Sequence, residues 1–106
     1  MLMKSAYIFI SIIFLNLFFL PLKSDEKYNL GKDVFLNKGN CATCHMLSEA
    51  NSFGQIGPNL DQIKPELPTI LNAVTMGVGI MPAFKDMLTD EEIESVSYYV
   101  FESTNK

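Results

Sequence analysis

The stretch Cys41-Ala42-Thr43-Cys44-His45 contains both cysteines and the one histidine of this 106-residue chain. This is a Cys-x-x-Cys-His motif, the pattern by which a haem is attached covalently to a protein. The two thiols, three positions apart, each add to one vinyl group of a haem, and the histidine lies beneath the iron. We therefore predict one haem c, with its iron, bound through Cys41 and Cys44 and ligated by His45.

Three other chemistries use the same residue types. A redox dithiol of the thioredoxin kind places Cys-x-x-Cys beside a strand-helix-strand pattern, and no such pattern of strands is found in this sequence. Structural zinc almost always takes four ligands, whereas Cys41, Cys44 and His45 supply three. A structural disulfide between the two cysteines is the third alternative. Haem attachment is the favoured interpretation.

The N-terminal segment differs in composition from the rest of the chain. Lys4 gives it a charged start, and residues 6–22 are almost wholly apolar. This is the layout of a secretory signal, and the apolar run is shorter than the about 20 residues that comfortably span a bilayer. We expect residues 1–24 to be an export signal peptide. The alternative is an uncleaved N-terminal anchor that tethers the chain to a membrane through residues 6–22.

In either case we expect residues 25–106 to form one domain outside the cytoplasm, in the periplasm or another exported compartment. The domain would be soluble if the signal is cleaved and membrane-anchored if it is not. Such a location agrees with the motif, because a free Cys-x-x-Cys pair there would risk oxidation. A domain this short is also marginal on its own apolar burial, and a covalent haem would supply a large apolar core.

The predicted domain is acidic. Two of the eight lysines, Lys4 and Lys23, lie in the export segment, so six lysines remain against all twelve acids, and there is no arginine. The resulting net charge of about −6 argues against nucleic acid as a partner. It fits a carrier that docks on a basic patch of another protein, where charge mostly governs the rate of encounter.

Helical periodicity predicts the first two helices of the domain. The first is expected over residues 30–38, with Asn29 as its N-cap. The second is expected to begin at Pro65 or Pro68 and to end at Met76, because apolar residues recur there at helical spacing. The predicted class is all-α, with three to four helices around the haem.

The last helix has the clearest start signal in the chain. Thr89-Asp90-Glu91-Glu92 is a capping box, and its acids suit the helix dipole. Ile93, Val96 and Val100 then form the expected buried stripe. Residues 48–61 are rich in turn formers and are expected to be a loop. We find no alternating apolar and polar run that is typical of a strand.

The sixth position on the iron has one favoured candidate. No second histidine is present, so methionine is the expected second ligand. Met46 directly follows the histidine and cannot reach the opposite haem face, and Met76 ends an apolar stripe that we expect to be core. Met87 fits either the core or the rim of the site. Met81 lies in the glycine-rich loop 77–88, which can wrap over a flat cofactor, although a loop methionine can also be a gap filler.

Gly57-Pro58 is expected to support the histidine. A ligating histidine usually donates its other ring N–H to a carbonyl group, which fixes the tautomer. The carbonyl of Pro58 is a good candidate for this acceptor, and the alternative is simply a turn. The candidate cofactor-binding residues are Cys41, Cys44, His45, Pro58 and Met81, of which His45 and Met81 are the candidate iron ligands.

Five segments follow one another in a specific order. They are Gly31-Lys32-Asp33-Val34-Phe35, the Cys41–His45 motif, Gly57-Pro58-Asn59-Leu60, residues 74–84 and the helix from Ile93 to Val100. Over about residues 28–103 the chain resembles the small single-haem class I c-type cytochromes of bacteria and photosynthetic organisms. The resemblance implies the cytochrome c fold, with crossing N- and C-terminal helices in which Gly31 and Phe35 meet Tyr99.

The same resemblance implies a function. His45 and Met81 would be the axial ligands, and the protein would be a single-electron carrier in an exported respiratory or photosynthetic chain, not an enzyme. Its partners would be redox proteins: a donor dehydrogenase or membrane complex, and an acceptor oxidase or photosystem. One alternative is a dedicated cytochrome subunit that accepts electrons from a periplasmic dehydrogenase acting on sulfite or an alcohol. Another is a haem sensor or peroxidase-like enzyme with a labile methionine ligand.

Overall fold

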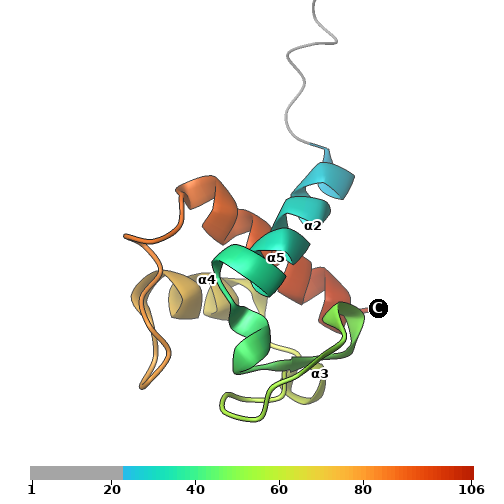
Figure 1. Ribbon diagram of the computed structural model, residues 1–106. Helices are drawn as coiled ribbons and strands as arrows, with labels where there is room; N and C mark the ends of the chain where they lie inside the picture. Colours follow the sequence, from blue (N-terminus) through green and yellow to red (C-terminus); the bar gives the residue numbers. More distant parts are fainter. Residues whose placement is uncertain (1–22) are drawn as a thin grey trace, which may run out of the picture.

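The computed structural model describes residues 23–106, so residues 1–22 of the predicted export segment 1–24, with the whole apolar run over residues 6–22, lie outside the described residues. This part of the chain is built from α-helices and connecting loops (Figure 1), and the predicted all-α class is confirmed. The α-helices are α2 (Ser24–Asp33), α3 (Leu60–Ile63), α4 (Leu67–Met76) and α5 (Asp90–Thr104). Between residues 23 and 106, no helix is both long and apolar enough to cross a bilayer.

Short elements connect these helices. A π-helical turn, η1 (Val34–Lys38), continues α2, and the 3-10 turns η2 (Cys41–Thr43) and η3 (Ser48–Ala50) follow. Strands β1 (Met46–Leu47) and β2 (Ser52–Phe53) form a small antiparallel hairpin, with Met46 opposite Phe53. The hairpin and α3 lie in or beside the predicted loop over residues 48–61, so the expectation of no strand was wrong. Two-residue strands are too short to produce an alternating pattern in a sequence.

The first helix begins earlier than its apolar pattern predicts. It starts at Ser24, and Asn29 lies inside α2, so the assignment of Asn29 as N-cap was wrong. The first turn is polar and carries Asp25 and Glu26, which interact favourably with the positive end of the helix dipole. This turn has no apolar residue to reveal its periodicity. The end of the helical segment, at Gly39, agrees with the prediction.

The two later helices agree with their sequence signals. Pro68 lies in the first turn of α4, where a missing N–H costs nothing, and Gly77 ends the helix with a positive φ of 77°. At the start of α5, the Glu92 N–H donates to Oγ1 of Thr89 at 3.1 Å. The Thr89 N–H donates to Oε1 of Glu92 at 2.8 Å, which completes the capping box.

Helices α2 and α5 cross in direct contact at Gly31 (Figure 1). A Cβ atom at this position would collide with the carbonyl oxygen of Ser95 and would lie 2.6 Å from Cβ of Tyr99. The Phe35 and Tyr99 rings then meet edge to face, with centroids 5.8 Å apart. The crossing that the resemblance implies is therefore present, and it depends on a residue without a side chain.

The core forms around this crossing. Its apolar side chains are buried and come from the π-helical turn, from α3, α4 and α5 and from the segments between them, and they are Val34, Phe35, Leu47, Ala50, Leu60, Ile70, Val74, Phe84, Leu88, Ile93, Val96, Tyr99 and Val100. Met76, which was expected to be core, is instead 57% exposed. It is the last residue of α4, one half-turn beyond the buried Val74, and it faces outward.

We expect Gly31→Ala to lower the free energy of unfolding by about 1–3 kcal/mol, the usual cost of overpacking, although alanine is the better helix former. The added methyl group meets backbone atoms of α5, which can yield only if the two helices separate. Urea unfolding of the haem-loaded protein measures the change. Asn29→Ala, on the exposed side of the same helix, is the control, and a Gly31→Ala variant as stable as this control would contradict the prediction.

Candidate haem site

The cysteine motif begins directly after the π-helical turn. Gly39 is buried where a Cβ atom would lie 3.0 Å from the Val34 carbonyl oxygen and 3.2 Å from Sγ of Cys41, so the chain can turn tightly there. Asn40 adopts a left-handed conformation with φ of 50°, and its Oδ1 accepts a hydrogen bond from the Thr43 hydroxyl at 2.8 Å. Asparagine tolerates this backbone region better than most residues. These contacts redirect the chain from the helix into η2.

Within the motif, the N–H groups of Cys44 and His45 both donate to the Cys41 carbonyl, at 3.1 and 3.0 Å. The two thiols are unbonded to each other and line the same cavity. Burial raises the pKa of the Cys41 thiol to about 11, and the neighbouring Cys44 thiol adds to the increase. A redox dithiol needs the opposite, a lowered thiol pKa. The buried Cys41 thiol thus lacks the lowered pKa on which a thioredoxin-like dithiol depends.

The imidazole of His45 is held from two sides. Its Nδ1 lies 2.8 Å from the carbonyl oxygen of Pro58, and because a carbonyl can only accept, Nδ1 carries the proton and donates. A Cβ atom at Gly57 would lie 2.6 Å from Cε1 of the ring, so only a glycine lets the loop pack flat against it. The Gly57 N–H also donates to the Cys44 carbonyl at 2.7 Å. In the neutral ring this contact fixes the tautomer with the proton on Nδ1, so Nε2 is the atom that would bind a metal.

A cavity of about 560 Å³ opens beside this ring. Its volume falls within the usual range of about 300–1,000 Å³ for sites that bind cofactors and small molecules. Apolar side chains from α4, α5 and the loop over residues 77–88 form most of its wall, among them Ile70, Val74, Phe84, Val96 and Val100. The motif therefore faces a space lined for a large apolar group.

Met81 also lines this cavity, and its loop is fastened at several points. The backbones of Val78 and Met81 exchange two hydrogen bonds, of 3.1 and 2.9 Å. The Phe84 N–H donates to the Val74 carbonyl at 2.9 Å, which joins the loop to α4. Gly77 makes the tight turn before it, where a Cβ atom would lie 2.7 Å from the Met81 carbonyl oxygen. The thioether is thus carried by a fixed backbone.

The other candidate methionines have different surroundings. Met46 accepts a hydrogen bond at its sulfur from the Asn59 amide, at 3.1 Å, and does not line the cavity. Met76 is also absent from the lining. Met87 does line the cavity but is 57% exposed, so it belongs to the rim, one of its two expected places.

Apolar side chains stay exposed around the mouth of the cavity. We call this set the apolar rim; its members, Ile56, Ile63, Val78, Ile80 and Met87, line the cavity and are 54–85% exposed. Ile80, next to Met81, is the most exposed of them, at 85%. Apolar groups gathered at one exposed place are typical of an interaction site. The sequence alone did not reveal this rim, because its members come from two loops and from the end of α3.

The donor set fits a covalently bound haem. Two thiols and an oriented imidazole lie on the wall of one apolar cavity, and a soft thioether lines the same cavity. Among residues 23–106, no cluster of three or more His, Cys, Asp and Glu side chains could hold a metal ion, so zinc is not supported there. The structure thus brings together all five predicted residues: Cys41, Cys44, His45, Pro58 and Met81 all line the cavity.

Two polar residues of the lining were missed by sequence reasoning. Outside the segment from Asn40 to His45, the polar residues of the cavity wall are Lys38 and Thr69. Lys38 ends the π-helical turn, and Thr69 lies in the first half of α4. A lysine at a helix end and a threonine in a helix are common features, so neither carried a signal that could have identified it.

Comparison with known proteins supports a covalently bound haem. Residues 26–100 match the family model described as cytochrome C oxidase, cbb3-type, subunit III. The cytochrome c6 of Bryopsis maxima is 39% identical over 84 residues, which are 73% of this chain and 92% of the relative. The cytochrome c6 of Leptolyngbya boryana is also 39% identical over 84 residues, covering 72% and 92%.

A solved structure is similar as well. The c-type cytochrome SorU from Sinorhizobium meliloti aligns with a TM-score of 0.72 and 45% sequence identity, over 77% of this chain and 95% of that one. With the crossing of α2 and α5 and the thiol-lined cavity, these matches show the cytochrome c fold. The chain therefore belongs to the family of small class I c-type cytochromes, electron carriers that bind haem c covalently.

Proposed function

We propose that this protein carries single electrons in an exported compartment, with a haem held covalently by Cys41 and Cys44 and ligated by His45 and Met81. When bound, the haem iron supplies the Fe(II)/Fe(III) couple. The observation that carries the proposal is the shared cavity: both thiols, the oriented imidazole and the thioether of the fastened loop line it together.

Each residue has a defined task in this proposal. The Pro58 carbonyl accepts a hydrogen bond from the Nδ1–H of His45 and so directs Nε2, the other ring nitrogen, to the iron. Met81 presents a soft, uncharged sulfur, which favours Fe(II) and raises the reduction potential. The apolar wall excludes water and favours the less charged Fe(II) state, so it also raises the reduction potential.

The fastened backbone explains how electrons would pass with little change in shape. The Met81 loop is joined to itself at Val78 and to α4 through Phe84, and the histidine loop is joined to Cys44 through Gly57. Both proposed ligands therefore keep their positions in either oxidation state. With His45 and Met81 both holding its iron, a bound haem would pass electrons and would bind no small substrate, in agreement with a carrier.

The apolar rim is the proposed contact surface for redox partners. Weak redox encounters bury small areas, and the centre of such a patch is depleted in charge. The donor would be a dehydrogenase or membrane complex, and the acceptor an oxidase or photosystem.

We further propose that residues 1–24 direct the chain to the periplasm or another exported compartment, and that residues 25–106 act there as one domain.

We expect Met81→Ala to keep the covalent haem but to open the sixth position on the iron. The variant should bind CO when reduced and should have a lower reduction potential, because the soft thioether is lost. Visible spectra of the oxidised and reduced protein, before and after CO, measure the effect. Met87→Ala is the matched control, because it removes a methionine of the rim and should leave the spectrum unchanged.

An unchanged spectrum in Met81→Ala, together with CO binding by Met87→Ala, would assign the ligand to Met87. Rapid CO binding by the unmodified reduced protein would instead favour a sensor or peroxidase-like function. Absence of a haem spectrum after export with the c-type maturation machinery would overturn the attachment of a haem at Cys41 and Cys44.

We also expect Ile80→Asp to slow electron self-exchange between oxidised and reduced copies of the protein several-fold at low salt, because a charge must be desolvated when two rims meet. NMR line broadening in mixtures of the two oxidation states measures this rate without a named partner. Phe53→Asp is the control, because Phe53 is 67% exposed, lies outside the cavity lining and changes the net charge equally. Equal rates in the two variants would contradict the proposed contact surface.

A further inference from the structure

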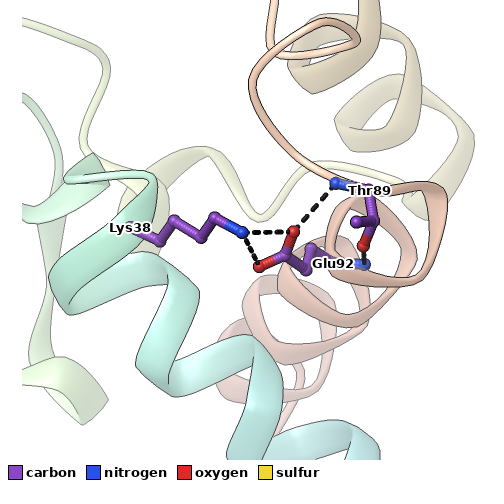
Figure 2. A network of polar contacts seen from close by, with 3 residues as sticks. All are labelled: Lys38, Thr89 and Glu92. Carbon is purple, nitrogen blue, oxygen red and sulfur yellow. Dashed lines mark hydrogen bonds and ion pairs between the residues drawn. The ribbon is translucent and has the colours of Figure 1, made fainter.

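One ion pair joins the segment before the cysteine motif to the start of the last helix. The Lys38 ammonium lies 2.9 Å from Oε1 and 2.8 Å from Oε2 of Glu92. The same Oε1 accepts the Thr89 N–H of the capping box at 2.8 Å, as Figure 2 shows. Glu92 is the less exposed partner, with 13% of its side chain accessible against 53% for Lys38. The carboxylate is thus held in place by two donors.

The pair is also asymmetric with respect to the cavity. Lys38 lines the cavity, whereas Glu92 does not. Apart from the histidine, Lys38 is the one ionisable cation of the lining, and no carboxylate of residues 23–106 lines it. It also lies three residues before Cys41, at the end of the turn that delivers the first thiol. The positive charge therefore belongs to a residue of the cavity wall, and its counter-charge belongs to a residue outside the lining.

We propose that Lys38 and Glu92 act as an opposed charge pair that tunes the reduction potential: Lys38 raises it and Glu92 limits the increase. A nearby cation disfavours the more positive Fe(III) state, and a nearby anion favours it. Because the cation is the member that lines the cavity, its effect is the larger of the two. The inference rests on the proposed occupancy of the cavity by haem, but not on Met81 as a ligand.

The chain offers variants that change the charges and keep the local fold. Glu92→Gln removes the negative charge but retains a side-chain oxygen that can accept the Thr89 N–H, as in capping boxes with glutamine. Lys38→Gln removes the positive charge at a half-exposed position, and Lys38→Arg preserves it. Lys32→Gln and Glu91→Gln make the same changes in net charge at residues that do not line the cavity, and they serve as controls.

The test is a redox titration of each haem-loaded variant at low salt, with unfolding by urea measured beside it. We expect Lys38→Gln to lower and Glu92→Gln to raise the potential, each changing the equilibrium constant for reduction about two- to tenfold. A tenfold change corresponds to about 59 mV for one electron. The reduction potential of the double variant should lie closer to that of the unmodified protein than the potential of Lys38→Gln does. Lys38→Arg should have the potential of the unmodified protein. High salt should diminish all of these shifts.

A purely structural role would give a different pattern. If the pair only anchored the motif segment, both single variants would loosen it, lose stability and shift the potential in the same direction. Shifts of equal sign, or shifts no larger than those of the two controls, would overturn the inference. Unchanged visible spectra in all variants show that axial ligation is intact, so a failure of the charge pair is distinguishable from a failure of the proposed ligands.

Discussion

The close approach of α2 and α5 at Gly31 is the contact on which the rest of the structure depends. Backbone meets backbone there, so the distance between the two helices is set by the absence of one side chain. This distance places Phe35 and Val96 together in the wall of the cavity. It also sets the position of the turn that follows α2, and therefore of the first thiol. A local packing constraint thereby determines the geometry of a site that lies some ten residues further along the chain.

The core and the cofactor seat share the same side chains. Seven members of the buried core also line the cavity, namely Phe35, Leu60, Ile70, Val74, Phe84, Val96 and Val100. A small domain buries a modest fraction of its apolar surface, and here some of the core side chains would be buried against the cofactor. Because a group that binds only the folded state stabilises it, haem attachment and folding are thermodynamically linked in such a design.

Much of the site could be predicted because its chemistry is local in sequence. Two thiols and a histidine at fixed spacing specify their cofactor, and Thr89 with Glu92 specifies a helix start without any tertiary information. The composition of two loops brought Pro58 forward as the acceptor for His45 and Met81 as an iron ligand, and the structure brings both to the cavity wall. The assignment of these residues as ligand and support remains a prediction that spectroscopy can test.

Other features depend on distant contacts and left no local signal. The exposure of Met76 follows from how the helices pack, and the pairing of Lys38 with Glu92 joins residues 54 positions apart. A charged residue at a helix end has many satisfactory partners in solution. Tertiary structure selects one of these partners, and no periodicity in the sequence predicts which one.

The π-helical turn over Val34–Lys38 makes the length of this segment as important as its composition. The Gly39 N–H reaches the Val34 carbonyl, five residues back, at 2.7 Å, where a regular α-helix would reach four. The turn thus accommodates one additional residue between the helix crossing and the motif. Deleting that residue would rotate everything after it by about 100° around the helix axis. Cys41 would then point away from the cavity, so insertions and deletions are far more damaging here than most substitutions.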